Sequence, residues 1–179
     1  MNIYQALNTT IFGGTVLALA AGLLKIAIPV HERPLTLWLF IAFFGLLRCK
    51  IFLDDHKYFG ATETRNPHFK VGFLVGVASW FFWVLGGYSV SALNEAYFLV
   101  GVAISISTLW IIVVALRRGA YREQYFWIAS NAAFVVLLWA VYRRDKPEGD
   151  LWTWVSLGVA ISWVVVDIVA SKSIPDLER

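Results

Sequence analysis

The sequence predicts an all-α, polytopic integral membrane protein, with about six transmembrane helices in one compact bundle joined by short loops. The chain of 179 residues is 59% hydrophobic and only 15% charged. A typical soluble domain is about 45–50% apolar and about 25% charged, so the excess of apolar residues must face something other than water. The charges gather into short runs that separate apolar segments of about 20 residues, the length that crosses a hydrocarbon core.

The apolar segments and the polar runs between them place the expected helices. We expect spans at residues 9–30, 35–53, 68–93, 95–116, 124–142 and 151–171. Pro34 and Pro67 each mark the start of a span, where a missing N–H costs little. Only a very short turn separates the third and fourth spans, so these two should form an antiparallel hairpin. With short loops throughout, residues 1–179 are expected to form a single transmembrane helical domain.

Composition also excludes several classes of protein. The formal charge of +3 comes from basic residues at the ends of the spans, a pattern typical of membrane topology and of contact with the lipid bilayer rather than of nucleic-acid binding. Cys49 is the only cysteine, so an intrachain disulfide and a cysteine zinc site are excluded. The three histidines lie at span ends, and we expect no cofactor and no metal. The first ten residues hold no Lys or Arg, so we expect the first span to be retained rather than cleaved as a signal peptide.

The basic residues divide unequally between the two sides of the membrane. With six spans, both termini lie on one side, which holds ten of the 15 Lys and Arg residues: Arg48, Lys50, Lys57, Arg65, Lys70, Arg117, Arg118, Arg122, Lys172 and Arg179. The other side holds five: Lys25, Arg33, Arg143, Arg144 and Lys146. The positive-inside rule then predicts that both termini are cytoplasmic.

Residues 46–60, LLRCKIFLDDHKYFG, carry both signs of charge directly after an apolar helix. The candidate binding and ion-pair residues in this stretch are Arg48, Lys50, Asp54, Asp55, His56 and Lys57. Lys50 and Asp54 are four residues apart, so they face each other on a continuing helix. Asp54, Asp55 and His56 are consecutive and point about 100° apart, so they ligate one metal ion only if the helix unwinds. The alternative interpretation is a solvated helix end, which has the same residue types.

Asp167 lies inside the last span and completes this set of candidates. Arg48 and Asp167 each lie about four to five residues before the ends of their spans, at similar depth on the same side of the membrane. An acid at that depth is costly unless it is paired, and an arginine fork binds a carboxylate with two hydrogen bonds. We therefore predict an Arg48–Asp167 ion pair. The alternative is that Asp167 faces a water-filled vestibule or bonds to Ser171 and backbone groups.

The fourth and fifth spans carry small and polar residues that are candidates for lining a solute path. Gly101, Ser105 and Thr108 recur at helical spacing on one face of the fourth span, and Asn131 lies near the middle of the fifth. A face of this kind serves either to pack helices closely or to line a path. Both interpretations are open at this point.

A small helical bundle with little soluble mass most often conducts, carries or binds something in the membrane, and no motif in this chain names a substrate. The leading hypothesis is a channel or carrier that moves a small solute or ion as a homo-oligomer, because 179 residues leave little interior for a path through one subunit. A basic vestibule of Arg48, Lys50, Arg117 and Arg118 would favour anions.

Other classes of protein fit the same sequence. One alternative is a membrane-embedded sensor or docking subunit that recruits a cytoplasmic protein partner through the Arg48–Lys57 segment. Another is a lipid-modifying membrane enzyme that uses Asp54, Asp55 and His56, although no nucleophile motif accompanies these groups. A substrate-binding subunit of a multi-component importer also fits the size and helix count.

Overall fold

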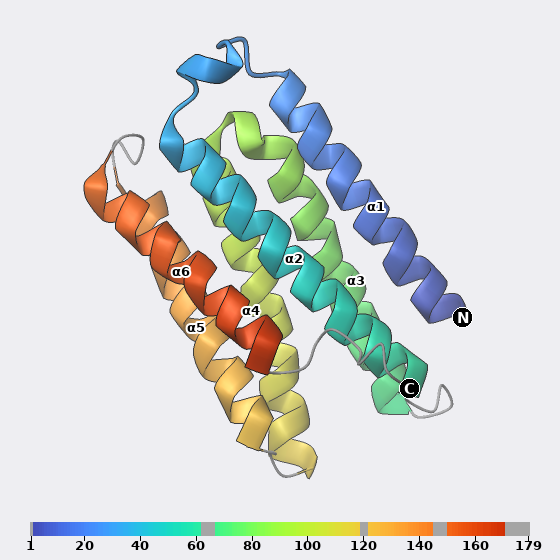
Figure 1. Cartoon of the computed structure of the whole chain (residues 1–179). Coiled ribbons are helices and arrows are strands. Elements are labelled where there is room, and N and C mark those ends of the chain that lie inside the picture. Colours follow the sequence, from blue (N-terminus) through green and yellow to red (C-terminus); the bar gives the residue numbers. More distant parts are fainter. Residues whose placement is uncertain (1, 62–66, 119–121, 145–149, 171–179) are drawn as a thin grey trace. The chain divides into compact units, whose positions relative to one another are not determined.

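The computed structural model describes residues 2–61, 67–118, 122–144 and 150–170, and these residues form helices and no strand. The helices shown in Figure 1 are α1 (Ile3–Leu24), α2 (Leu35–Ala61), α3 (Pro67–Tyr88), α4 (Leu93–Arg118), α5 (Arg122–Tyr142) and α6 (Leu151–Ala170). Each of the six contains a stretch that is long and apolar enough to cross a membrane. The predicted all-α fold with six membrane spans is therefore confirmed, and the chain is a multi-pass membrane protein.

The first helix begins and ends earlier than the sequence predicted, at Ile3–Leu24 instead of residues 9–30. Its start is fixed by a reciprocal cap, in which the Gln5 N–H donates to Asn2 Oδ1 over 2.9 Å and the Asn2 N–H donates to Gln5 Oε1 over 3.0 Å. At its other end, the Lys25 N–H bonds to the Gly22 carbonyl over 3.2 Å, the tighter spacing of a closing helix turn. Pro29, which lacks a donor, follows shortly after.

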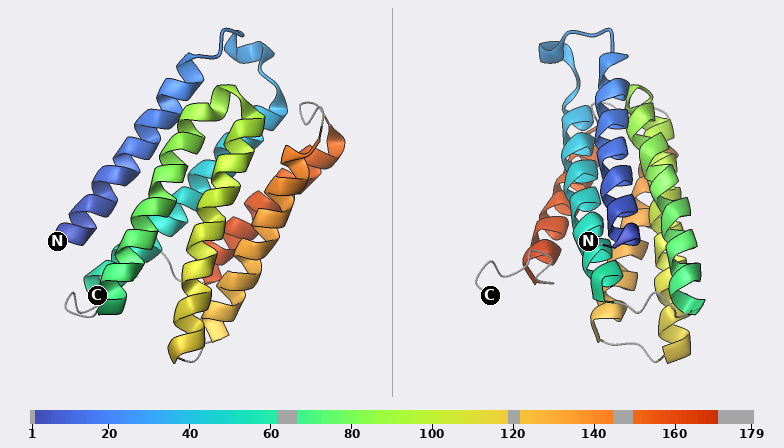
Figure 2. Two further views of the ribbon diagram at one scale, coloured as in Figure 1. Left: turned by 180° about the vertical axis from the view of Figure 1, so that it is seen from behind. Right: turned by 90° about the vertical axis from the view of Figure 1, so that its right-hand side faces the viewer.

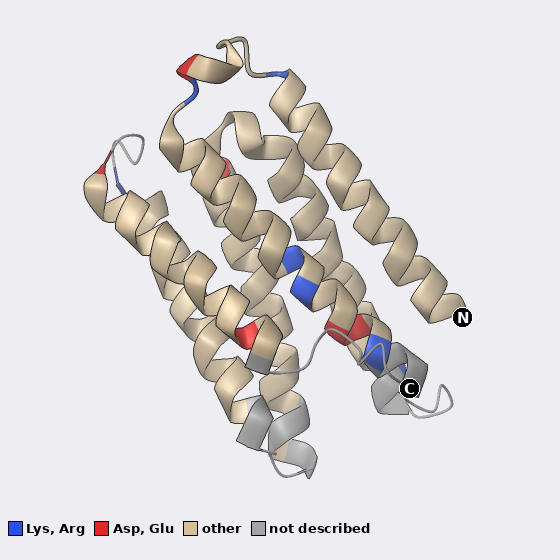
Figure 3. Ribbon diagram, viewed as in Figure 1, with Lys and Arg blue, Asp and Glu red and all other residues tan. Residues whose placement is uncertain are grey.

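The second helix runs past the expected end of its span at residue 53 and continues to Ala61. The charged residues of the 46–60 stretch therefore lie on regular helix for their whole described length. Figure 3 shows basic and acidic positions along the second half of α2 and one acidic position near the end of α6, while long stretches of the other ribbons carry no charge. Helical geometry thus fixes the directions of these charged side chains relative to one another.

Contacts within the chain gather into two compact units. Unit 1 consists of Met1–Phe12, Ile28–Thr62 and Lys146–Arg179, and so holds the first turns of α1 together with α2 and α6. Unit 2 consists of Gly13–Ala27 and Glu63–Asp145, and holds the rest of α1 with α3, α4 and α5. That residues 1–179 behave as one domain stays a prediction.

In unit 1, α2 and α6 pack side by side and run in the same direction, as Figure 1 and Figure 2 both show. The first turns of α1 lie against the second half of α2. There the Asn8 amide donates to the Phe52 carbonyl over 3.1 Å, and the Phe12 ring stacks on the Phe52 ring with 4.5 Å between centroids. A polar and an aromatic contact thus fix the beginning of the chain to the charged part of α2.

In unit 2, α3 and α4 form the predicted antiparallel hairpin, closed by a 3-10 turn at Ser89–Ser91. The contacting positions run in opposite order along the two helices: Gly72 lies against Trp110, Ser79 bonds to the Ala103 carbonyl and the Ser107 hydroxyl, and Gly86 lies against Val100. Small residues therefore let the two backbones approach closely. The pairing of α4 with α5 adds an aromatic group, with the Phe98 ring centroid 5.7 Å from that of Trp139 and 5.4 Å from that of Tyr142.

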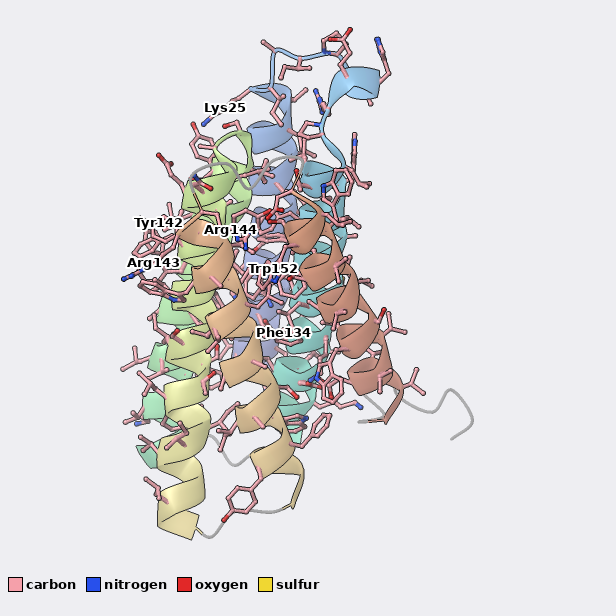
Figure 4. All side chains as sticks on the ribbon, turned by 90° about the vertical axis from the view of Figure 1, so that its left-hand side faces the viewer. Lys25, Phe134, Tyr142, Arg143, Arg144 and Trp152 are labelled. Atoms are coloured by element: carbon pink, nitrogen blue, oxygen red, sulfur yellow. The ribbon has the colours of Figure 1, made fainter. Side chains whose placement is uncertain are left out.

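The second part of α1 approaches the end of α3 closely at Gly22. A Cβ atom at Gly22 would lie 2.5 Å from the Gly87 carbonyl oxygen and 2.7 Å from the Tyr88 carbonyl oxygen. One turn on, the Lys25 ammonium lies over the Tyr88 ring, 3.1 Å from its centroid, and Figure 4 shows Lys25 leaving the end of α1. A cation over an aromatic face is a favourable contact where the ring is partly out of water.

We predict that Gly22→Ala destabilises the protein, because the new methyl group overlaps backbone oxygens that cannot rotate away. The expected loss is about 1–3 kcal/mol of unfolding free energy, the usual cost of overpacking. Unfolding in detergent, followed by tryptophan fluorescence, measures it. Gly14→Ala is the matched control on the same helix, since no heavy atom lies within 4 Å of its Cβ position. Equal stabilities of the two variants would contradict the close approach at Gly22.

Candidate functional site

The charged residues of α2 divide by burial. Arg48 and Lys50 are almost completely buried, with 1% and 6% of their surfaces exposed, whereas Lys57 is exposed. Asp54, Asp55 and His56 are intermediate. Asp167, on α6, is 3% exposed. The cluster is therefore not simply a solvated helix end, because two cations and one carboxylate lie where water has little access.

Lys50 is the centre of the ion pairs. Its ammonium nitrogen lies 2.6 Å from Asp54 Oδ2, one turn along α2, and 3.1 Å from Asp167 Oδ2 on α6. One buried ammonium thus bridges two carboxylates from two helices. In an apolar interior an isolated charge is very costly, so the three groups stabilise one another and join α2 to α6.

The predicted partner of Asp167 was wrong: Lys50, not Arg48, makes this ion pair. Depth along the helix did not decide between the two cations, since they are only two residues apart. The direction of the side chains decides between them, because residues two positions apart on a helix point about 200° apart. Only one of the two cations can therefore face α6. Ser171, the other partner considered for Asp167, lies outside the described residues.

Arg48 instead faces the beginning of the chain. Its guanidinium carbon lies 5.5 Å from the centroid of the Phe12 ring on α1. Within the described residues, none of the three guanidinium nitrogens has a hydrogen-bond partner. Asp55, which lies two turns further along α2, attracts the guanidinium without a hydrogen bond. Arg48 is thus a buried cation with its donors unused.

Arg48 is one end of a stripe of contacts that we call the α1–α2 seam, formed by Gln5, Asn8, Phe12, Arg48, Phe52 and His56. The α2 members are four residues apart and share one face. Besides the Asn8 and Phe12 contacts with Phe52, Gln5 donates its amide to the His56 carbonyl over 3.2 Å. Two more buried atoms of the seam, Asn8 Oδ1 and His56 Nδ1, have no hydrogen-bond partner in the described part of the chain.

Sequence reasoning missed the α1 half of this seam. The first span was expected to begin at residue 9, which left Asn8 outside it. A usable signal existed, because Gln5, Asn8 and Phe12 recur at helical spacing and Asn2 with Gln5 is a capping pattern. Treating residues 2–8 as helix would have placed Gln5, Asn8 and Phe12 on one face of the first span, but would not have shown which helix that face contacts.

The candidate path residues make local contacts in unit 2. A Cβ atom at Gly101 would lie 3.3 Å from the Trp139 indole nitrogen on α5. The Ser105 hydroxyl donates to the Gly101 carbonyl over 2.8 Å, and the Thr108 hydroxyl donates to the Ile104 carbonyl over 2.7 Å. Asn131 is half-buried. The Gly101–Trp139 approach joins two packed helices, whereas the two hydroxyl hydrogen bonds lie within α4. A path-lining role for these residues stays a prediction. The side chains of Arg117 and Arg118 lie outside the described residues.

The candidate metal-binding and catalytic residues Asp54, Asp55 and His56 do not converge on one point in the structure. Among the described residues, no set of three or more His, Cys, Asp or Glu side chains could hold a metal ion. Asp54, Asp55 and His56 lie on uninterrupted helix, so their side chains diverge. Asp54 is also engaged by Lys50.

Comparisons with known proteins give no further guidance. No family model matches the chain, and neither does any curated protein or solved structure. What the protein does is therefore inferred from the chemistry of its own charged residues.

We predict that Lys50 and Asp167 are energetically coupled. In a double-mutant cycle with Lys50→Met and Asp167→Leu, Lys50→Met leaves both carboxylates without their cation, and Asp167→Leu leaves Lys50 with Asp54 alone. The double change removes both members of the pair between the helices. The losses of unfolding free energy should therefore be less than additive, by about 1–3 kcal/mol. Denaturant unfolding in detergent measures them. The matched cycle with Arg48→Met in place of Lys50→Met should show a smaller coupling, and the reverse ranking would contradict the assigned pairing.

Proposed function

We propose that the protein is a carrier that binds a small solute at the charged residues of α2 and α6 and moves it across the membrane. The observation that supports this is the buried Lys50 ammonium shared by Asp54 and Asp167. Charged side chains inside membrane helices are expensive, and in membrane proteins they commonly mark substrate or ion pathways.

A carrier fits this arrangement better than an open channel. Lys50 contributes one positive charge and the two carboxylates two negative charges, so the trio has one excess negative charge. Arg48, with unused donors, has the compensating positive charge nearby on the same helix. Ion pairs that share a partner can exchange it when a charged solute arrives, and such an exchange changes how α2 contacts α6. Binding and helix movement are thereby linked through the same few atoms.

The carrier is proposed to be a homo-oligomer, since one chain of this length offers little interior. Exposed apolar side chains on several helices suit contact with lipid and with further copies alike: Leu17, Leu74, Leu109, Val136 and Val169. The mass of the intact particle in lipid nanodiscs decides this point. A particle with a single chain contradicts the oligomer, though not the carrier.

No specific contact favours the other functions. A docking surface on the Arg48–Lys57 segment would not include Arg48 or Lys50, because both are buried. A lipid-modifying enzyme would need Asp54 and His56 to act on one substrate from diverging positions of one helix. The carrier is therefore the function we retain.

We predict that purified protein in liposomes moves small charged solutes down an imposed gradient. Electrical recording on solid-supported membranes, with a panel of inorganic and organic anions and cations, measures the movement. Lys50→Met and Asp167→Asn should reduce it to background, because each breaks the shared ion pair. Lys25→Met is the matched control, since Lys25 lies over Tyr88 in the other unit. No movement of any solute by the unmodified protein would exclude the carrier function.

We also propose that both termini are cytoplasmic, on the ten-to-five division of basic residues. To test this, Cys49 is replaced by Ser, and a single cysteine is added at either end of the chain. A membrane-impermeant thiol reagent should label neither terminal cysteine in intact cells and both after permeabilisation. Labelling of both ends in intact cells would show the opposite orientation, and labelling of one end alone would contradict an even number of spans.

A further inference from the structure

We infer that the α1–α2 seam is a binding site for an oxyanion, held by the Arg48 guanidinium. The inference rests on the proposed function in one respect, because it names the chemical class of solute that the carrier takes. Its basis is separate, namely the unused donors of Arg48 rather than the ion pairs of Lys50. The ligand is a carboxylate or phosphate group able to present two oxygen atoms along one edge.

The first step is the donor count at Arg48. A guanidinium carries five N–H donors in a fixed plane and cannot lose its charge under ordinary conditions. Buried polar groups in native proteins are nearly always hydrogen-bonded, and leaving a charged one unsatisfied is costly. Yet Nε, Nη1 and Nη2 of Arg48 are all buried without an acceptor among the described residues, and 1% of the residue is exposed. Such a group points to an acceptor outside the described residues, and we take that acceptor to be a ligand.

The second step concerns the type of acceptor. The carboxylates of Asp54 and Asp167 both bond to Lys50 and lie on the other side of α2. Asp55 attracts Arg48 without bonding to it. The planar fork of an arginine matches the two oxygens of a carboxylate or phosphate, and this pairing is stronger than a hydrogen bond between neutral groups. A monatomic anion such as chloride has no such edge and fits the fork less well.

The third step concerns what surrounds the guanidinium. The Phe12 ring lies beside it and stacks on Phe52, which gives one side of the site an apolar wall. Asn8 Oδ1 and His56 Nδ1, both buried without partners in the described residues, lie along the same seam. A hydroxyl or amino group on the oxyanion would satisfy Asn8 Oδ1. The site therefore favours a small organic acid or phosphate ester with an additional donor over a bare inorganic anion.

An oxyanion can reach this site as a dissolved solute or as the phosphate of a lipid headgroup. Both sources present the same two-oxygen edge to Arg48, so the experiment must separate them. Inorganic phosphate and lactate serve as soluble probes, with chloride as the comparison anion. Phosphatidylglycerol, which carries a phosphate and hydroxyl groups, serves as the lipid probe.

We predict that delipidated protein in a non-ionic detergent binds the soluble probes through Arg48. Isothermal titration calorimetry measures the binding. Arg48→Met should weaken it by about tenfold to hundredfold, the value of one or two charge-assisted hydrogen bonds, and Arg48→Lys should give an intermediate loss because the charge remains without the fork. Arg143→Met, an exposed arginine at the end of α5 that is labelled in Figure 4, should leave the affinity unchanged.

Stability without ligand separates a binding role from a structural one. If Arg48 awaits a ligand, Arg48→Met should leave the thermal unfolding temperature of the ligand-free protein unchanged or raise it, because the change removes an unsatisfied buried charge. A marked fall in that temperature for both Arg48→Met and Arg48→Lys would mean that the arginine already has a structural partner. That result overturns the inference.

The remaining outcomes assign the source of the oxyanion. Binding of phosphate or lactate, with chloride ineffective, supports a soluble ligand. No calorimetric binding, but phosphatidylglycerol retained on the unmodified protein and lost from Arg48→Met in native mass spectrometry, supports a lipid headgroup. If neither calorimetric binding nor lipid retention is observed, the proposed site is overturned. These readouts need no flux, so binding without transport leaves the site intact and excludes the carrier. Transport that Arg48→Met does not change leaves the carrier intact and overturns the claim that the bound oxyanion is the transported solute.

Discussion

The bridge from Lys50 to Asp54 and Asp167 is the constraint on which the arrangement of unit 1 depends. A single ammonium or carboxylate among apolar helices would be prohibitively costly, so each of these groups is stable only while the others are in place. The consequence is geometric as well as energetic. Asp167 can occupy its position only if α6 stands beside the face of α2 that carries Lys50, so the ion pair fixes the rotation of one helix against the other. Apolar packing alone tolerates many such rotations, because leucine, valine and phenylalanine surfaces are interchangeable.

Once Lys50 is directed toward α6, helical geometry directs Arg48 elsewhere. The two residues are separated by about 200° around the helix, so a helix that presents one to α6 must present the other to a different neighbour. That neighbour is the first turns of α1, where Phe12 supplies an aromatic face and Asn8 an amide. The two cations therefore differ in their surroundings. Lys50 shares its charge with two carboxylates, whereas Arg48 lies beside an aromatic ring and its donors have no acceptor among the described residues.

The sequence predicts the properties of single segments, but not the contacts that depend on how the helices assemble. Six helices follow from hydropathy, since apolar length is a property of each segment by itself. The turn between α3 and α4 was predicted for the same local reason, and so was the pairing of Lys50 with Asp54, because i and i+4 face each other on any helix. The partner of Asp167 was not predicted correctly, because it depends on how α2 and α6 are rotated against each other. The seam with α1 was missed because capping by Asn2 and Gln5 adds a turn and a half of helix that hydropathy does not register. The close approaches of Gly22 to Gly87 and of Ser79 to Ala103 likewise depend on how the helices assemble, so they are known only from the structure.

Cys49 lies between the two buried cations in sequence and is itself exposed. Because the three residues are consecutive on a regular helix, the thiol points to a third direction, toward neither α6 nor the seam. The unmodified chain therefore contains one natural attachment point for a spectroscopic reporter, about one residue of helix rise from both charged centres. A fluorophore or spin label placed there would register rotation of α2 as a change in its surroundings, with neither cation altered and no second thiol to remove.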